Sequence, residues 1–474
     1  ATIKNKNEFL EWIVSLRGST SLVYSAIRPT PLEISLVTSS KIDKKIKIIK
    51  SSKDNKNKKI FKFDRQAKQY IKPKLNEQAK YLDSRKLLPV IFFFFSRERV
   101  ESSSRQLANQ MSVIPNRNEI KDKYNIVFND LTPEEINLLN LDEHMWMWSR
   151  GVGFHHAGLA PIVKEFVEYL FLNKYIKYLF ATETLALGIN MPAKSIYIDR
   201  LHKYDGIKTR PLTQSEFLQL SGRAGRRGID DKGFAFLSYD KNINRDWYSN
   251  LFTLKPNDLI SAFSVNYSSI LNLLNLYSVD ESVELLQKSF FAYQNNYKTE
   301  SLENIFYAKY GVLKELGFIN SDKGNVLTQT YRDNLIPGIY LLNRELKKDF
   351  ELKLMFISTG ITNERAEFAI SDKFDSLLSS FQSSLEFVNK TESSNGVKKL
   401  MTLNFSWFSV FYEYMKTNNI EYVVNKFGLN VGDFIKVAKE ASELSKKLSL
   451  IYEDKDFEQI NNIFDNNLIQ KTMT

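Results

Sequence analysis

The chain has 474 residues, of which 43% are hydrophobic, and this length predicts about three domains that each bury an apolar core. It contains no run of about 18 apolar residues, and its first residues lack the apolar stretch of a signal peptide, so we expect no membrane association and no secretion. The absence of cysteine excludes disulfides and thiolate metal sites, and with only four histidines we expect no metal centre. This composition fits a cytoplasmic protein.

The net charge of +11 comes from one basic segment, residues 41–80, which holds 15 Lys and Arg against four Asp and Glu. The remaining residues carry 51 basic and 51 acidic side chains. The Lys-, Asn- and Ser-rich middle of the segment, residues 51–59, is typical of a solvated, mobile loop. Such a segment suits a nucleic-acid backbone, and an ordinary surface loop is at least as good an interpretation.

Residues 88–240 alternate short apolar runs with amphipathic stretches, which predicts a parallel sheet with helices on both faces. We expect helices from 97 to about 111, from the Thr132-Pro133 cap, and from Pro161, whose helix has an apolar face. Ligands of such sheets bind at the carboxyl ends of the strands, and we expect the distinctive residues there. The expected strands are 90–95, 178–180, 195–198 and 233–237.

Beyond residue 240 the pattern becomes helical. Residues 256–292 predict helices, and a further helix should end at Gly317. A hairpin turn through Lys323-Gly324 then predicts a winged-helix module. From 331 to 474 helical periodicity with few glycines or prolines predicts a helical bundle.

Residues 219–228 read Gln-Leu-Ser-Gly-Arg-Ala-Gly-Arg-Arg-Gly and space Arg223 and Arg226 around Gly222 and Gly225. A guanidinium can grip phosphate oxygens bidentately, and glycine lets the backbone come close to a ligand. The string therefore predicts an arginine-finger loop, with a basic surface loop as the alternative.

Polar residues follow two of the expected strands: Ser96 and Arg97 after the first, Thr182 and Thr184 after the second. Hydroxyls and backbone N–H groups at strand ends can hold nucleic-acid phosphates without reading sequence. Turn-capping hydroxyls and a plain surface arginine are the alternatives.

Two further strings have open interpretations. His155 and His156 are adjacent in an expected strand, so they point to opposite faces, and we expect a structural or RNA-side role for them. Lys203-Tyr-Asp-Gly206 contains the Asp-Gly pair that is typical of a hairpin turn.

The order and spacing of residues 96–97, 151–161, 181–193 and 219–228 resemble motifs IV, IVa, V and VI of the superkiller-like DExH-box RNA helicases of superfamily two. The resemblance extends over essentially the whole chain. It implies a RecA-like fold for the parallel sheet, followed by the winged-helix and helical-bundle domains. It also implies that the hairpin near 203–206 wedges between the strands of a duplex.

The resemblance implies roles for single residues. Arg223 and Arg226 would stabilise charge on a transferring phosphoryl group, with Gln219 orienting phosphate or water. Gly188 and Asn190, together with Gly222 and Gly225, would face the nucleotide, although a tight turn and a cap are alternatives for the first two. The implied RNA contacts are Ser96, Arg97, His156, Gly158, Thr182, Glu183 and Thr184.

Two parts of such an ATPase are missing from the sequence. No Gly-x-x-x-x-Gly-Lys-Ser/Thr loop occurs, and Asp142-Glu143-His144 lacks the intervening residue of a DExH box. The residues after Ala1-Thr2 resemble those after motif III. We therefore expect the first RecA-like domain, and with it most of the ATP and Mg²⁺ site, to be absent, and the chain alone to hydrolyse no ATP. Residues 292–303 leave no room for the arch insertion of exosome-associated members.

These interpretations divide the chain into a motif III remnant and connection (1–30), a second RecA-like domain (31–245), a winged-helix domain (246–330) and a helical bundle (331–474). Implied partners are single-stranded or partly duplex RNA, a first RecA-like domain in cis or in trans, and a 3′ to 5′ exonuclease, with 3′ to 5′ movement on RNA. A DNA-repair helicase of the related archaeal branch is an alternative, although that branch tends to have proline where Glu183 and Arg227 stand. A non-catalytic RNA-binding half of a split helicase is another.

Overall fold

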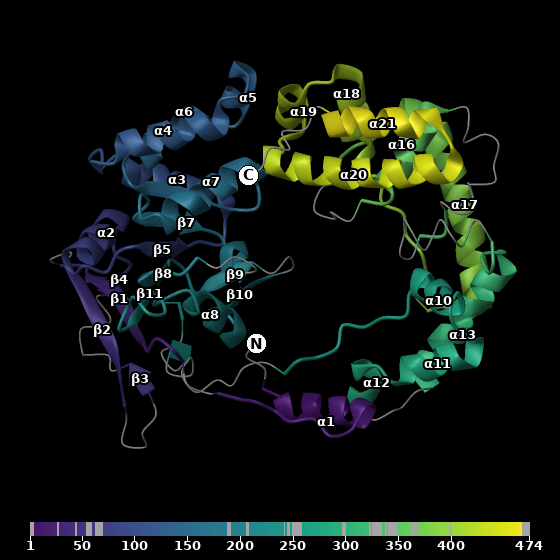
Figure 1. Cartoon of the computed structure of the whole chain (residues 1–474), viewed down its shortest axis with the longest axis horizontal. Helices are drawn as coiled ribbons and strands as arrows, with labels where there is room; N and C mark the ends of the chain where they lie inside the picture. The colour runs from purple at the N-terminus through teal and green to yellow at the C-terminus, as the bar shows by residue number, and fades with distance from the viewer. Residues whose placement is uncertain are drawn as a thin grey trace. The chain divides into compact units, whose positions relative to one another are not determined.

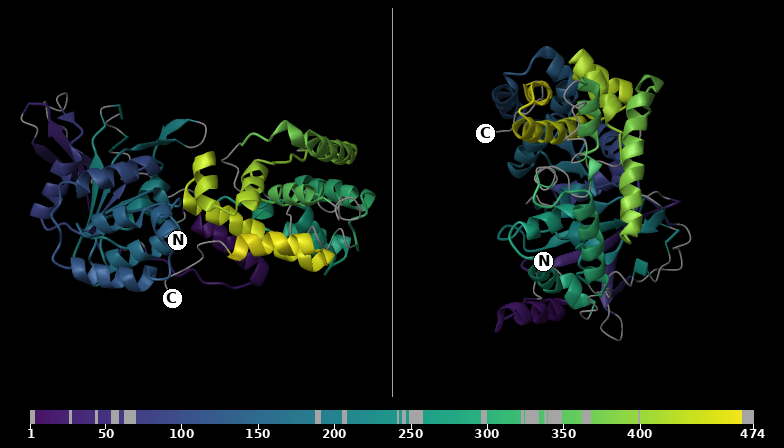
Figure 2. Two further views of the ribbon diagram at one scale, coloured as in Figure 1. Left: turned by 90° about the horizontal axis from the view of Figure 1, so that it is seen from above. Right: turned by 90° about the vertical axis from the view of Figure 1, so that its right-hand side faces the viewer.

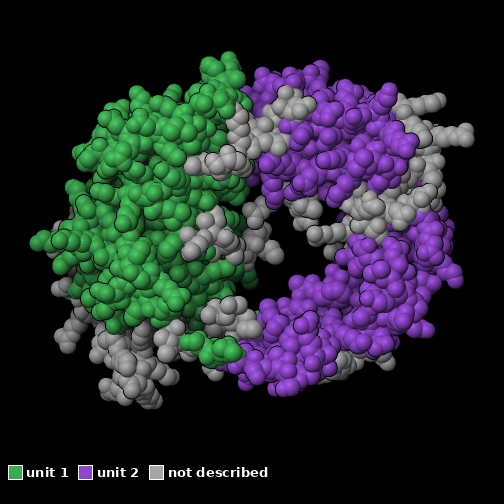
Figure 3. All heavy atoms as spheres, in the orientation of Figure 1, with its two compact units in different colours: residues 1–4, 23–258, 470–474 green, residues 5–22, 259–469 purple. Residues whose placement is uncertain are grey.

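The computed structural model describes residues 4–25, 28–42, 45–53, 59–61, 70–186, 191–204, 208–240, 242–243, 247–248, 258–295, 300–321, 324, 334–336, 339, 349–361, 368–398 and 400–466. The chain forms two compact units (Figure 3). Unit 1 consists of residues 1–4, 23–258 and 470–474, and unit 2 of residues 5–22 and 259–469.

Unit 1 is built on a mostly parallel sheet, as predicted (Figure 1). The four strands expected in the alternating pattern are present, as is β6, the strand expected at His155, and the unexpected strand β1 completes the parallel part. Strand β11, the last of the described strands in sequence, lies in the middle of the sheet, between β1 and β8. In sheet order the parallel strands are β1 (Leu32–Ser40), β11 (Gly233–Ser238), β8 (Ser195–Ile198), β5 (Val90–Phe93), β7 (Tyr178–Ala181) and β6 (Val152–His155).

The basic segment extends this sheet through antiparallel strands, so its interpretation as a solvated loop is wrong for these parts. Strand β2 (Ile46–Lys53) pairs with β1, β3 (Lys59–Phe61) with β2, and β4 (Tyr70–Ile71) with β1. The reason is a period of two: Ile46 and Ile48 pack on the core while Lys47 alternates with them. Residues 54–58, within the expected mobile stretch, lie outside the described residues.

Helices cover both faces of the sheet, as expected (Figure 2). In β5, Val90 and Phe92 pack in a cluster with α2 (Leu75–Ser84) and α3 (Arg97–Ala108). Ile91 and Phe93 point the other way and are equally buried. The sheet is therefore buried on both sides at β5, which explains why this strand is uniformly apolar.

The predicted helix starts are confirmed. Helix α5 (Pro133–Leu138) has a capping box formed by Thr132 and Glu135, and α7 (Pro161–Leu172) buries its whole apolar face. Helix α4 (Arg117–Phe128) lies in a stretch that the sequence marks only as polar. Helix α6 (Leu141–Trp148), which follows α5, contains Asp142-Glu143-His144. The apolar face of α7 comprises Ile162, Val163, Phe166, Val167, Leu170 and Phe171.

The predicted hairpin is present as strands β9 (His202–Tyr204) and β10 (Thr209–Pro211), which pair antiparallel. Lys203 stands opposite Arg210. The Asp-Gly turn itself lies outside the described residues.

Unit 2 is helical in its described residues, as the periodicity predicts (Figure 1). Gly317, at φ 71°, follows the end of α13 as expected. Lys323 and most of the expected wing lie outside the described residues, so the winged helix stays a prediction. Residues 296–299, in the region where we expect no arch, also lie outside them, so that expectation stays a prediction as well. The helices are α1 (Lys6–Arg17), α10 (Tyr267–Leu274), α11 (Val279–Gln287), α12 (Phe290–Gln294), α13 (Glu300–Glu315), α16 (Phe350–Ser358), α17 (Asp375–Ser394), α18 (Phe408–Thr417), α19 (Ile420–Phe427), α20 (Val431–Tyr452) and α21 (Lys455–Asn466).

Among the described helices, none has the length and apolar character that crossing a membrane requires.

Candidate functional site

The hydroxyl residues gather at the carboxyl edge of the sheet. Strands β5 and β7 pair in parallel with Phe93 opposite Ala181, so they end side by side. Thr182 follows β7 directly, and Ser96 lies three residues beyond β5. The structure therefore brings Ser96 and Thr182 to the same edge, as the sequence predicts.

Residues 219–228 lie at the opposite, amino edge of the sheet. They connect α8 (Gln214–Ser221) to the first residue of β11, Gly233. Ala224 forms a bridge with Ala193, just before β8 begins, and Gly225 N–H donates to the Ala193 carbonyl at 2.7 Å. The expectation that all distinctive residues lie at the carboxyl ends is thus wrong for this segment, because it precedes a strand.

The segment 182–193 joins the two edges. It starts at the carboxyl end of β7, forms the 3-10 turn η2 (Glu183–Ala186), and reaches the amino end of β8 at Ala193. Gly188 and Asn190, the expected nucleotide-facing residues, lie outside the described residues.

Arg226 is held by Asp230 in a bidentate ion pair. Its Nε and Nη2 donate to the two carboxylate oxygens at 2.7 and 2.8 Å, and its backbone N–H donates to the same carboxylate at 2.9 Å. Burial alone would raise the pKa of Asp230, whose side chain is 3% exposed, but the hydrogen bonds from Arg226 lower it below its ordinary value. The pair does not use Nη1, so that end of the guanidinium can address a phosphate.

Arg223 is placed by backbone contacts around it. Its N–H donates to the Leu220 carbonyl, and its own carbonyl accepts from Ala193 N–H at 2.9 Å. Burial lowers the pKa of its guanidinium. Gln219 is exposed four residues earlier on α8.

Arg28, which the sequence analysis missed, fixes the carbonyl end of α8. Its Nη2 donates to the carbonyls of Ser221 and Ala224 at 2.9 and 2.5 Å. These bonds satisfy acceptors that a helix end leaves open. The contact spans almost two hundred residues of sequence, so local pattern carries no signal of it.

The two glycines of the loop differ in what they do. Gly225 has φ +86°, and a Cβ there would lie 2.6 Å from the Thr30 methyl and 3.0 Å from the Gly233 backbone. Gly222 has an ordinary helical φ of −56°. Glycine at 225 therefore lets the loop pack on the sheet, which is a structural reason for it beside the expected approach to phosphate.

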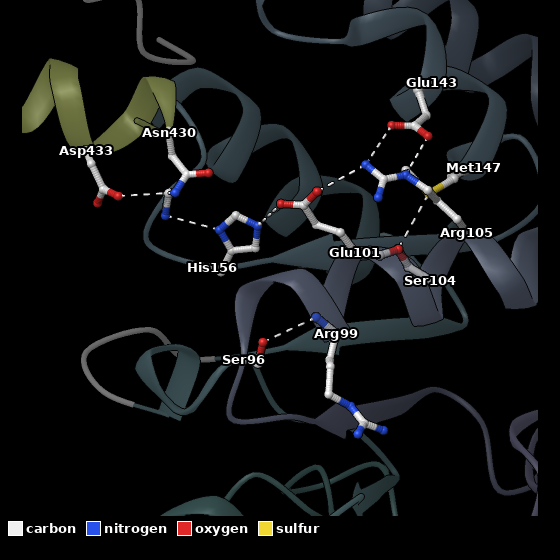
Figure 4. A network of polar contacts seen from close by, with 11 residues as sticks. Ser96, Arg99, Glu101, Ser104, Arg105, Glu143, Met147, His156, Asn430 and Asp433 are labelled. Carbon is white, nitrogen blue, oxygen red and sulfur yellow. Dashed lines mark hydrogen bonds and ion pairs between the residues drawn. The ribbon is translucent and has the colours of Figure 1, made fainter. Parts of the chain in front are cut away.

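At the carboxyl edge the hydroxyls are engaged locally. Ser96 is the N-cap of α3 and accepts from Arg99 N–H at 3.5 Å (Figure 4). The hydroxyls of Thr182 and Thr184 lie 2.8 Å apart and share a hydrogen bond. Arg97 is half-buried in the first turn of α3. The capping alternative is thus real for Ser96, and the paired threonines present two hydroxyls together.

Glu183, an expected RNA contact, pairs with Lys203 of the hairpin. Lys203 Nζ lies 2.9 and 2.7 Å from the two Glu183 oxygens and 2.8 Å from Glu216 of α8. Arg210 holds Glu216 from the other strand with two bonds of 2.9 Å. Burial would raise the pKa of Glu216, but the hydrogen bonds from Arg210, Lys203 and Thr213 lower it strongly. Sequence reasoning missed this cluster because its members are far apart in the chain.

His156 and Gly158 form one unit with α3. Gly158 N–H donates to His156 Nδ1 at 3.1 Å, so the ring proton sits on Nε2, which faces Glu101 at 3.0 Å (Figure 4). Glu101 also accepts from Arg105, which binds Glu143 of α6, and the hydrogen bond from His156 lowers the pKa of Glu101. His155 points to the other face and pairs with Glu168. Each imidazole therefore has a carboxylate partner at Nε2, and the expected RNA-side role of His156 stays a prediction.

Known proteins with similar sequences are helicases. ATP-dependent RNA helicase mtr4 of Schizosaccharomyces pombe is 31% identical over 329 residues, which cover 64% of this chain and 29% of that protein. DExH-box ATP-dependent RNA helicase DExH10 of Arabidopsis thaliana is 33% identical over 393 residues, 76% of this chain and 39% of that protein. Probable helicase HelY of Mycobacterium tuberculosis is 32% identical over 320 residues, 62% of this chain and 35% of that protein.

No protein-family model matches the chain. The chain spans about a third of the length of the curated relatives it matches.

Proposed function

The chain is homologous to the superkiller-like DExH-box RNA helicases of superfamily two, and from this premise we propose that it is the C-terminal part of an ATP-dependent RNA helicase. The observation that carries the proposal is the segment 182–193. It starts beside paired hydroxyls at one sheet edge and ends at the arginine loop at the other. Such a segment can couple nucleotide chemistry to movement on RNA.

At the amino edge, Arg223 and Arg226 stabilise the negative charge of the transferring phosphoryl group, and Gln219 orients phosphate or water. Asp230 holds the Arg226 guanidinium in one orientation. The backbone at Gly222 and Gly225, together with Gly188 and Asn190, faces the nucleotide at this edge. ATP and Mg²⁺ are bound mainly by a first RecA-like domain, in cis or in trans, so the chain alone hydrolyses no ATP.

At the carboxyl edge, Ser96, Arg97, Thr182 and Thr184 contact RNA phosphates, which grips a strand without reading its sequence. Glu183, whose carboxylate pairs with Lys203, and His156 and Gly158, which contact Glu101 of α3 through the His156 ring, complete the proposed RNA side. Cleft opening and closing moves these contacts along one strand in the 3′ to 5′ direction, and the β9–β10 hairpin separates duplex strands.

The remaining domains and partners follow the same proposal. Residues 31–245 form the second RecA-like domain, 246–330 a winged helix and 331–474 a helical bundle, with 1–30 leading in from motif III. Relatives include the "Exosome RNA helicase MTR4" of mouse. By analogy, we propose that the helicase supplies RNA to a 3′ to 5′ exonuclease in the cytoplasm.

The test uses the full-length protein and the 474-residue chain side by side. We expect the full-length protein to hydrolyse ATP when RNA is added and to unwind an RNA duplex with a 3′ overhang faster than one with a 5′ overhang. The chain alone should bind single-stranded RNA and hydrolyse no ATP.

Three outcomes would contradict the proposal. Turnover by the chain alone would show that the phosphate site is complete. Unwinding of DNA but not RNA duplexes would favour the DNA-repair alternative. RNA binding without hydrolysis, even after a separate first RecA-like domain is added, would favour a non-catalytic RNA-binding half.

A further inference from the structure

We propose that Lys203 is a positioning residue that makes the β9–β10 hairpin move together with the motif V turn η2 and with helix α8. This inference rests on the proposed function, because it assigns Lys203 to the coupling of ATP turnover with strand separation. Each of the three elements contributes one part of the contact: Lys203 from the hairpin, Glu183 from η2 and Glu216 from α8.

The geometry leaves Lys203 no capacity for another ligand. An ammonium group has three N–H donors, and Lys203 Nζ has three carboxylate oxygens within 2.9 Å. Its side chain is 13% exposed. A lysine in such surroundings joins protein elements and does not bind an RNA phosphate.

The second strand of the hairpin is attached to the same helix. Arg210 stands opposite Lys203 and binds both oxygens of Glu216. Both strands are therefore fixed to Glu216, and β9 also reaches Glu183 through Lys203. Removing Lys203 breaks the contact with Glu183 in η2 and leaves the pair of Arg210 with Glu216 of α8 in place.

Glu216 transmits this attachment to the arginine loop. It is the third residue of α8 and accepts from Thr213 N–H at 2.7 Å in a capping box. Helix α8 has eight residues and leads into Gly222 and Arg223 at its other end. A short, capped helix moves as a rigid body, so a shift at Arg223 displaces Glu216 and the hairpin.

Lys203 also balances two like charges. Glu183 and Glu216 share one ammonium, and without it Glu216 keeps the guanidinium of Arg210 whereas Glu183 loses the Lys203 ammonium. Substitution by a neutral residue should therefore weaken the attachment of η2 to α8. Arginine at the same place can still bridge both carboxylates.

The functional test measures base pairs unwound per ATP hydrolysed by the full-length protein. We expect Lys203→Met to lower this ratio at least about five-fold, while RNA-stimulated hydrolysis falls less than about two-fold. Lys203→Arg should restore most of the ratio, and Lys177→Met, at an exposed lysine outside the hairpin, should leave it unchanged. An unchanged ratio in Lys203→Met, or a weakened RNA affinity as its main defect, would overturn the proposal.

A second measurement does not depend on helicase activity. In the 474-residue chain, Glu183→Gln should increase amide hydrogen exchange in residues 202–204, 209 and 210, because the neutral amide weakens the attachment of the hairpin to η2. Unchanged exchange there would overturn the proposal even if the protein unwinds RNA. If the wild-type protein neither hydrolyses ATP nor unwinds RNA, the proposed function fails, and this exchange result still decides whether Lys203 joins the elements.

Discussion

The carboxyl and amino edges of the sheet in unit 1 carry different kinds of side chains. The carboxyl edge offers the neutral hydroxyls of Thr182 and Thr184, which bond to each other. The amino edge holds Arg226, whose orientation is fixed by the buried carboxylate of Asp230. The first arrangement gives weak contacts that can be made and released, and the second gives a charge that is already aligned.

This difference matches the tasks that we propose for the two edges, which are RNA binding at the carboxyl edge and ATP hydrolysis at the amino edge. A strand that is moved stepwise must be released at every step, so each contact should contribute little. A transition state is stabilised best by groups that do not reorganise during the reaction. The following predictions test this contrast, since changes at the amino edge should affect turnover and changes at the carboxyl edge RNA affinity.

Arg226→Ala should have the largest effect. In the full-length protein we expect RNA-stimulated ATP hydrolysis to fall by about 10³-fold, as for other arginine fingers, with RNA affinity nearly unchanged. Steady-state hydrolysis and fluorescence-anisotropy titration with RNA measure the two quantities. Arg227→Ala, at the exposed neighbour, is the matched control. If Arg226→Ala weakens RNA binding as much as hydrolysis, the separation of the two edges is wrong.

Gly225→Ala should have the next largest effect, which is a loss in the free energy of unfolding. The added methyl lies 2.6 Å from Thr30 and the residue keeps φ +86°, so we expect the free energy of unfolding to fall by about 3 kcal/mol. Gly228→Ala is the matched control, because its φ is +75° but a Cβ there has no heavy atom within 4 Å, and it should cost about 1 kcal/mol. Denaturant unfolding of the 474-residue chain measures both. Equal losses would show that packing on the sheet is not the reason for glycine at 225.

Strong local sequence patterns were enough to predict many of the helices and strands of unit 1. The phenylalanine run of β5 and the apolar face of α7 each determine one element. Strand β1 escaped prediction because Ser35, Thr38 and Ser39 occupy buried positions and dilute its apolar pattern. Strand β2 escaped because its lysines raise the charge of a segment whose isoleucines still face the core.

The site shows the same limit. The residue types and spacing of the string 219–228 predict that Arg226 is an arginine finger, but they do not reveal that Asp230 holds its side chain. The contacts from Lys203 to Glu183 and Glu216, and from Arg28 to α8, depend on how distant segments fold together. Residue chemistry is therefore readable from the sequence, whereas the partners that orient it come from tertiary structure.

Asp230→Asn tests whether alignment of Arg226 matters, with a smaller effect. The amide keeps the shape but loses the charge, so we expect about ten-fold slower hydrolysis at unchanged RNA affinity and a loss of about 2 kcal/mol in unfolding free energy at pH 7. The folded state lowers the pKa of Asp230, so its contribution is present above the unfolded value of about 4 and is lost as the pH falls through the folded pKa. The stability difference between wild type and variant should thus be constant from about pH 7 to 5 and shrink below about pH 4. A difference that grows on acidification would contradict this assignment.

Thr182→Ala should have the smallest effect. It changes the carboxyl edge, so it should affect RNA affinity and not ATP hydrolysis. Losing one neutral hydroxyl contact is expected to weaken RNA binding about three-fold, because such a bond contributes about 0.5–1.5 kcal/mol. The salt dependence of binding should not change, since no charge is removed, and hydrolysis at saturating RNA should stay near the wild-type rate. Thr182→Ser keeps the hydroxyl and its bond to Thr184, so it should bind RNA like the wild type. A Thr182→Ala protein that binds RNA normally but hydrolyses ATP slowly would place this hydroxyl on the nucleotide side of the segment 182–193, and the division between the two edges would have to be redrawn.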